Sequence, residues 1–253
     1  MRDFTIEKYR ELCSAIKGTY ETLTFREYIN NLNFKNNFVI LRHDVDRMPA
    51  NALKTAEVEN EFNIKSTYYF RVNNSVFKEE IIEKIASLGH EIGYHYECID
   101  KADGDFKKAI KIFENDLEKF RRIYDVKTIC MHGNPLTKYD NRDLWGEYDF
   151  REFGILGEAY LSMGSDVAYF SDTGRNWGNK YKVKDFNVNL NNNYDKVNIR
   201  TTDDMINLIE SKKLEKICIL THPERWSKNL IEWIGYFTFD KGVQVFKKLK
   251  YKI

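Results

Sequence analysis

The stretch Val39-Ile40-Leu41-Arg42-His43-Asp44-Val45-Asp46 joins an apolar run to two carboxylates. The apolar, β-rich part predicts a buried strand over residues 37–42. Side chains alternate along an extended backbone, so two carboxylates at positions i and i+2 can face one cavity. One of them can bind a cation while the other stays free as a base. The plainer alternative is a loop start in which Asp46 pairs with Arg47.

On either side of this stretch, predicted strands alternate with predicted helices. The further strands expected are 66–72, 92–96, 126–131, 167–170 and 217–220, and the helices are 4–17, 50–61, 78–88, 103–123 and 202–211. Such repetition is typical of parallel strands with helices outside, so we expect an α/β fold. The carboxyl ends of these strands would then share one edge, where active sites assemble in α/β barrels.

Three further local patterns complete this outline. Thr24-Phe25-Arg26-Glu27 has the capping-box form and predicts the start of a short helix. Gly18 and Gly89 are placed to end the helices before them. Residues 139–165 have no clean period and predict excursions between strands, and residues 179–199 predict a loop or an irregular hairpin.

Bulk composition excludes several classes of function. The chain has 253 residues with 40 basic and 39 acidic side chains, so no general charge attracts nucleic acid or anionic membranes. No run approaches the roughly 18 apolar residues of a membrane span, and the charged N-terminus is unlike a signal peptide. The cysteines are widely spaced, which indicates reduced thiols in a cytoplasmic protein. The basic C-terminal stretch 246–253 is interpreted as a solvated helix end or strand, with contact to an acidic lipid or surface as the alternative.

All five histidines lie in four strand-like segments. His43, His95, His132 and His222 fall at or near the carboxyl ends of predicted strands, whereas His90 opens its strand and is interpreted as structural. Imidazole suits both metal ligation and proton transfer near neutral pH. His95 is the best single ligand candidate, and period-two geometry puts Glu97 on the same face. His132 is interpreted either as a site residue or as a hydrogen-bonded core histidine.

Two later segments combine acids, bases and aromatic rings. Asp172-Thr173-Gly174-Arg175-Asn176-Trp177 follows a strand and suits carbohydrate binding, with polar groups for hydroxyls and a ring for a sugar face. The alternative is a surface turn with a stacked Arg–Trp pair. His222-Pro223-Glu224-Arg225-Trp226 has the same character, and His222 ends a strongly apolar strand as a suitable general acid.

In this order, the segments resemble the motifs of polysaccharide deacetylases of carbohydrate esterase family 4, the NodB-homology domain. Arg42 to Asp46 matches the family's aspartate-pair motif, and Ser66 to Phe70 is similar to its second-strand Ala-Thr-Phe-Phe. Gly89 to His95 closely matches its Gly-His-Glu-Ile-Gly-Asn-His. The segments at His132, Asp172 to Trp177 and His222 stand in the places of its later motifs. The match runs from about residue 36 to 226.

The resemblance implies a distorted (β/α) barrel of about seven parallel strands, TIM-like in outline. We therefore expect a single domain, 1–253, made of an N-terminal helical extension (1–35), the barrel (36–226) and a C-terminal extension (227–253). It also implies a metal-dependent amidase or esterase. A divalent ion, zinc in the first instance, would polarise the acyl carbonyl and activate water.

Site roles follow from the resemblance position by position. Asp44 becomes the general base and His222 the general acid, while Asp46 and His95 become metal ligands. The substrate-binding set that we expect around them is His43, Glu97, Asp172, Arg175, Trp177, Arg225 and Trp226.

Two positions depart from the family's pattern. The family's second motif has another histidine four residues after the first, where this chain has Ile99, which cannot bind metal. The third ligand then comes from His132, Glu97 or a water, and His132 is favoured because its strand should adjoin that of His95. The family's third-motif arginine is also replaced, and Arg42 or Arg175 could supply its charge.

Three functions remain open at this point. The first is a metal-dependent deacylase acting on an N-acylated sugar, such as a glycan precursor. The second, motivated by Ile99, is an inactive barrel that binds glycans or acts as a scaffold. The third is a metal-dependent amidase that acts on a non-sugar substrate.

Overall fold

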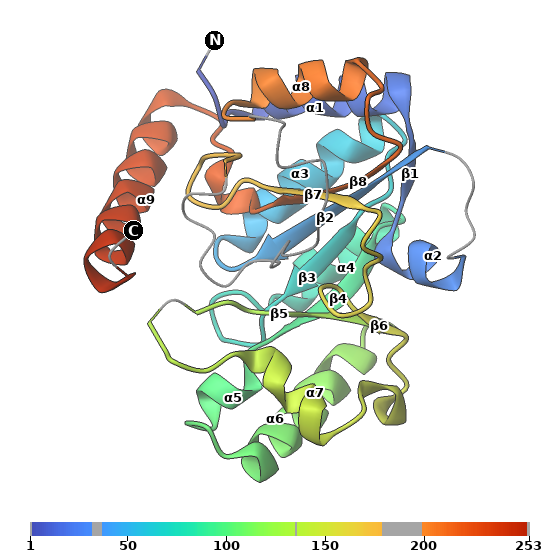
Figure 1. The fold of residues 1–253 in the computed structure, drawn as a ribbon, viewed down its shortest axis with the longest axis vertical. Helices are drawn as coiled ribbons and strands as arrows, with labels where there is room; N and C mark the ends of the chain where they lie inside the picture. Colours follow the sequence, from blue (N-terminus) through green and yellow to red (C-terminus); the bar gives the residue numbers. More distant parts are fainter. Residues whose placement is uncertain (1, 32–36, 135, 179–198, 252–253) are drawn as a thin grey trace.

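A parallel sheet curls through the centre of the chain (Figure 1). The structure is a computed structural model, and it describes residues 2–31, 37–134, 136–178 and 199–251. The strands in these ranges are β1 (Glu21–Leu23), β2 (Phe38–Val45), β3 (Thr67–Phe70), β4 (Glu91–Tyr96), β5 (Thr128–Met131), β6 (Gly157–Glu158), β7 (Ala168–Ser171) and β8 (Lys216–Thr221). Their order is β6-β5-β4-β3-β2-β8-β7, and β1 pairs with the beginning of β2. Every described pairing is parallel, which confirms the distorted (β/α) half-barrel.

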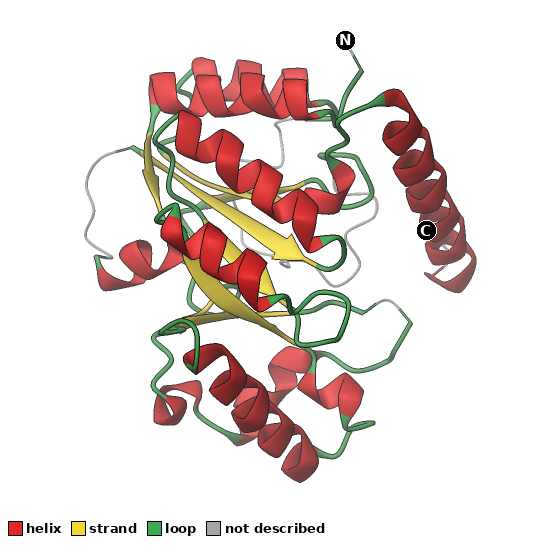
Figure 2. Cartoon of the chain, turned by 180° about the vertical axis from the view of Figure 1, so that it is seen from behind, coloured by secondary structure: helices red, strands yellow, loops and turns green. Residues whose placement is uncertain are grey.

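Helices cover the outside of the curl (Figures 1 and 2). The α-helices are α1 (Ile6–Thr19), α2 (Phe25–Asn30), α3 (Pro49–Glu61), α4 (Glu79–Ser87), α5 (Cys98–Lys101), α6 (Phe106–Arg121), α7 (Leu144–Glu147), α8 (Thr202–Glu210) and α9 (Leu230–Tyr251). Short 3-10 turns are η1 (Asn141–Asp143), η2 (Phe150–Phe153) and η5 (Pro223–Arg225). In the described part of the chain, no helix combines the length and apolarity needed to span a bilayer.

Local sequence signals explain most of the helix ends. Thr24 and Glu27 form the predicted capping box, and Gly89 follows α4 with a φ of +87°, which favours glycine. The helix expected over residues 103–123 is α6, which begins only at Phe106, because Gly104 adopts a φ of +88° and Asp105 caps the helix start. The predicted stop at Gly18 is one residue early, since α1 continues to Thr19. The loop or hairpin predicted over 179–199 lies, but for Ile199, outside the described residues.

Strand β2 places its side chains alternately on the two faces of the sheet. Arg42 and Asp44 occupy one face, where Arg42 Nη2 donates to Asp44 Oδ2 at 3.1 Å. His43 lies on the other face, between β2 and helix α3, where its ring stacks on Tyr68. All eight residues of β2 are buried, so the sequence that specifies the strand also fixes which groups face inward.

Glu59 of α3 is the centre of a buried polar network behind β2. Its carboxylate lies 2.6 Å from His43 Nε2, and it accepts hydrogen bonds from Ser66 Oγ at 2.6 Å and Tyr68 Oη at 2.8 Å. His43 Nδ1 in turn lies 2.6 Å from Thr221 Oγ1 on β8. Burial by itself would raise the pKa of Glu59, but His43 and His90 outweigh it and lower this pKa to about 2. The network therefore ties α3 to the strands that carry Asp44 and His222.

Glu59→Gln is expected to lower the free energy of unfolding by about 3 kcal/mol, because it replaces a buried carboxylate that several side chains hydrogen-bond. Glu57→Gln, an exposed glutamate on the same helix, should change it by less than about 0.5 kcal/mol. The pKa of Glu59 is depressed from 4.5 to about 2, so its contribution is complete above pH 4.5 and is lost as the pH falls toward 2. Urea unfolding at neutral and acidic pH measures this. Equal stability of the two variants at neutral pH would refute the role of Glu59.

Candidate functional site

Three side chains with metal-binding atoms converge at the carboxyl edge of the sheet. His95 is the penultimate residue of β4. His132 follows β5, and its N–H extends the ladder by donating to Tyr96 O at 2.7 Å. Asp46 Oδ1 lies 2.9 Å from His132 Nδ1 and 3.3 Å from His95 Nε2. The two imidazole nitrogens are 3.3 Å apart. The structure thus brings together Asp46, His95 and His132, the three residues proposed from sequence as ligands.

The hydrogen bonds of His95 prepare one ring nitrogen for ligation. Its Nδ1 lies 3.0 Å from the carbonyl oxygen of Cys130 and donates to it, so Nε2 faces the cluster and is the unprotonated atom when the ring is neutral. Burial would lower the pKa of His95, but Asp44 and Asp46 outweigh it and raise this pKa. Burial alone would raise the pKa of Asp46. The nearby imidazoles of His132 and His95 have the larger effect and hold this pKa well below its usual value. The negative charge of Asp46 and a positive charge on the imidazoles therefore stabilise each other in the cluster.

The donor set fits a divalent metal. Asp46 Oδ1 is buried and has no hydrogen-bond partner despite its short distances to two imidazoles. One carboxylate and two histidines are a common ligand set of catalytic zinc and related ions, with positions left for water and substrate. The ligand atoms lie within 4.8 Å of one another, which suits a single ion.

A second group of possible ligands, Asp44, His95 and Cys130, shares His95 with the first. Arg42 argues against a cation there. Its guanidinium is fully buried, lies 3.1 Å from both Cys130 Sγ and Asp44 Oδ2, and packs over the ring of Tyr160. A fixed positive charge at this distance opposes a metal ion in the same place. Of the two arginines considered from sequence, it is Arg42 that contacts Asp44.

His222 is held by a buried aspartate on the neighbouring strand. His222 Nδ1 lies 2.6 Å from Asp172 Oδ1, and the backbone N–H of His222 donates to Asp172 Oδ2 at 3.0 Å. Burial and Arg225 lower the pKa of His222, but Asp172 and Asp46 outweigh them, and the net shift is upward. The charge of Asp46 is among the groups that raise the pKa of His222.

Several residues expected to contact substrate instead support His222. Arg225 Nη1 donates to Asp172 Oδ1 at 2.7 Å, and Trp226 Nε1 donates to Asp172 Oδ2 at 3.2 Å. Asp172 is fully buried, and Trp177 and Trp226 are each 1% exposed in the core around Phe4. Their interpretation as sugar-binding groups is corrected, because their side chains are enclosed by protein.

Three other expected substrate contacts are paired with protein groups outside the Asp46, His95 and His132 set. His43 is fully buried in the Glu59 network, on the opposite face of β2, so its interpretation is also corrected. Glu97 is paired with Arg71 Nη2 at 2.6 Å instead of joining the ligands. Arg175 lies over the rings of Phe4 and Trp233, with its Nη1 donating to the carbonyl of Arg225 at 2.9 Å.

Ile99, where a family ligand is missing, is part of the hydrophobic core. The adjoining backbone is held by Asn141, whose Oδ1 accepts from Ile99 N at 2.9 Å and whose Nδ2 donates to His132 O at 3.1 Å. Asn141 thus links Ile99 to His132, the residue expected from sequence to be the third ligand. It lies in the aperiodic stretch 139–165, where no sequence signal singles it out.

Glu224 is a further group that the sequence analysis did not single out. Its side chain is buried next to Arg47, at 3.5 Å, and its Oε2 has no hydrogen-bond partner. Burial and the charge of Asp46 raise the pKa of Glu224 to about 7. The adjacent residues Pro223 and Arg225 do not indicate that Glu224 is buried, because its burial depends on how η5 packs.

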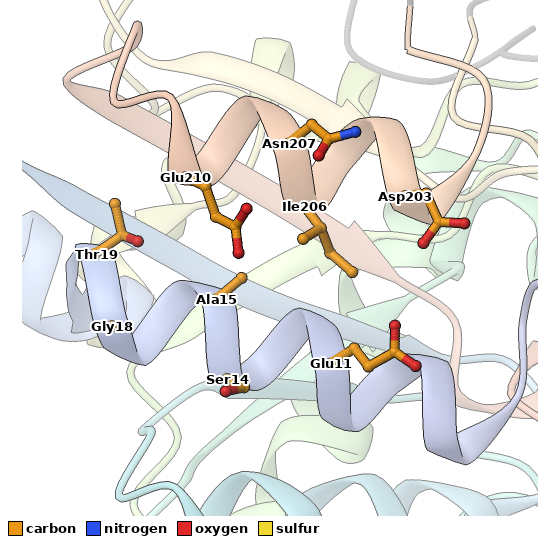
Figure 3. A pocket seen from close by; sticks show the side chains of 9 residues that line it. All are labelled: Glu11, Ser14, Ala15, Gly18, Thr19, Asp203, Ile206, Asn207 and Glu210. Carbon is orange, nitrogen blue, oxygen red and sulfur yellow. The ribbon is translucent and has the colours of Figure 1, made fainter.

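A groove of about 700 Å³ lies elsewhere, between α1 and α8 (Figure 3). Its wall carries Glu11 and Asp203, and Lys8 Nζ bridges these two acids at 2.5 and 2.7 Å. None of the catalytic, metal-ligand or substrate-binding candidates proposed from sequence lines it. The chemistry predicted from sequence is therefore at the sheet edge and not in this groove.

Comparison with known proteins gives similarities to solved structures only. No protein-family model matches the chain, and no curated protein is a significant match. One similar solved structure is described as "Structure of a Streptococcus mutans CE4 esterase". The chains are 10% identical, the alignment covers 92% of this chain and 90% of that chain, and the TM-score is 0.47. A likeness of this degree assigns neither a family nor an activity.

Proposed function

We propose that this protein is a divergent, metal-dependent deacylase that hydrolyses the amide of an N-acylated sugar or glycan precursor, with acetyl as the first acyl group to test. The observation that carries the proposal is the convergence of Asp46, His95 and His132 beside Asp44. The sugar specificity rests on the motif resemblance. We infer that His132 supplies the metal ligand that Ile99 cannot supply. The missing ligand at Ile99 is then no longer a reason to expect an inactive protein.

Asp46, His95 and His132 would hold the metal, zinc in the first instance. When bound, a divalent ion supplies a Lewis acid that polarises the acyl carbonyl and acidifies a water. Asp44 Oδ2 lies 3.8 Å from His95 Nε2 and is held by Arg42, while its Oδ1 is buried without a hydrogen-bond partner. Asp44 Oδ1 is thus the atom we assign to take a proton from the attacking water.

His222 is assigned the opposite proton transfer. Because its Nδ1 is bonded to Asp172, the proton on Nε2 is the one that can pass to the leaving nitrogen. The raised pKa of His222 favours the protonated ring near neutral pH. Water adds to the acyl carbon, the C–N bond breaks, and the amine leaves with the proton from His222.

Activity should fall as His222 loses its proton. Because the pKa of His222 is raised above 6.5, the alkaline limb of the kcat/KM profile is expected above pH 6.5. Asp172→Asn removes the carboxylate that raises this pKa, so the limb should move to lower pH. The pH–rate profiles of the two proteins measure the shift. An alkaline limb that stays in place in a folded Asp172→Asn protein would reject His222 as the acid.

The activity itself is tested by acetate release from N-acetylglucosamine oligomers with zinc-loaded protein. We expect turnover that a chelator abolishes and added zinc restores. Metal-dependent cleavage of simple amides without release from acetylated amino sugars would indicate the non-sugar amidase. Zinc-loaded protein that binds the oligomers without turnover would indicate the inactive barrel.

A further inference from the structure

Helix α9 lies along one side of the molecule and contacts the body through one face (Figures 1 and 2). Trp233 Nε1 donates to Asp3 O at 2.8 Å, and Gln244 Nε2 donates to Gly174 O. Asp240 is buried with its Oδ1 3.8 Å from Arg47. Arg47 and Gly174 follow β2 and β7, so α9 is docked on loops at the same sheet edge as the Asp46 cluster.

The outward side of α9 exposes large apolar side chains. Ile231 is 84% exposed, Ile234 52% and Val245 56%. At 100° per residue these three lie within one broad arc, roughly opposite the inward-facing Trp233, Asp240 and Gln244. Leu230 and Phe239 are also exposed. Neighbouring exposed apolar residues of this size mark an interaction surface, whereas a scattered exposed leucine does not.

The charge of the segment identifies the kind of partner. From Lys241 to Ile253 the sequence has five lysines and no acidic residue. Lys241 lies just outside this arc, about 20° from Ile234, and its Nζ donates to Gln244 Oε1 at 3.2 Å. A second copy of the chain would bring the same lysine-rich sequence with it and be repelled by it, whereas an anionic lipid surface attracts lysines and also accepts apolar side chains.

We propose that α9 is an interfacial helix that binds the protein to an anionic lipid bilayer, lying on the surface without crossing it. Because its inward face is docked on the loops after β2 and β7, binding through α9 brings the edge that carries the Asp46 cluster to the membrane. This inference does not depend on the proposed deacylase activity.

The test is sedimentation of the full chain with vesicles of phosphatidylcholine alone or mixed with phosphatidylglycerol. We expect binding to the anionic vesicles that weakens as salt is raised. The triple variant Ile231→Ser, Ile234→Ser and Val245→Ser should bind at least about tenfold more weakly. Leu156→Ser with Leu161→Ser, also exposed but far from α9 in sequence, should bind like the wild type.

Circular dichroism confirms that each variant is folded. Equal vesicle binding by the triple variant and the wild type would overturn the proposal, as would equal binding to neutral and anionic vesicles. Wild-type dimerisation that the triple variant loses, without vesicle binding, would assign the surface to a second copy. Vesicle binding is measured without substrate or metal. A negative result would therefore refute membrane binding and would say nothing about the deacylase activity.

Discussion

Asp44→Asn is expected to bind zinc as tightly as the wild type and to lose about a thousandfold in kcat. The substitution keeps the shape of the side chain and its contact with Arg42 but removes the atom that accepts the proton from water. Asp44 is held 3.1 Å from Arg42 and lies outside the three-residue ligand set, so metal binding should be unaffected. Steady-state kinetics on zinc-loaded protein, with bound zinc measured in parallel, separates the two effects.

The matched control is Asp166→Asn, which removes an exposed carboxylate paired with Lys216. It should leave kcat within about twofold, because surface charges away from a site contribute little. Full activity in Asp44→Asn would remove Asp44 from the role of base. Loss of zinc from the same variant would instead make Asp44 a ligand.

His132→Ala is expected to weaken zinc binding by more than about a hundredfold, since it removes one of three protein ligands. The Nδ1 of His132 lies 2.9 Å from Asp46 Oδ1, closer than any other imidazole nitrogen in the described residues. Competition with a chromophoric chelator, using protein without a histidine tag, measures the affinity. Turnover at saturating zinc should also fall in this variant.

Cys130→Ser is the control for this prediction. Cys130 adjoins the same cluster, but its sulfur lies 3.1 Å from the Arg42 guanidinium, so it should not hold a cation. The serine variant is therefore expected to keep wild-type zinc affinity. The reverse outcome, with Cys130→Ser losing zinc and His132→Ala keeping it, would move the metal to the second group of ligands.

Residues whose position follows from strand periodicity could be predicted from sequence. Alternation along β2 places Arg42 and Asp44 on one face, and parallel strands bring Asp46, His95 and His132 to one edge. The choice of His132 over Glu97 as third ligand followed from strand adjacency alone, and in the structure Glu97 pairs with Arg71. Roles tied to these geometric facts remain proposals until measured.

Residues whose role depends on tertiary contacts could not be predicted. The pattern at Asp172, Trp177 and Trp226 resembles a sugar-binding surface, yet packing of the N-terminal segment over it buries both rings against Phe4. Glu59 lies in an ordinary helical sequence, and its partners come from separate strands. Burial of this kind leaves no periodic signal along the chain.

The most direct test of the central claim is the X-ray absorption spectrum of the zinc-loaded protein at the zinc edge. The account predicts nitrogen and oxygen neighbours at about 2.0–2.1 Å, two of them imidazoles, and no sulfur. Replacing His132 by alanine should remove one imidazole from the spectrum. A sulfur neighbour at about 2.3 Å would place the metal at Cys130 and contradict the assignment of Asp46, His95 and His132 as its ligands.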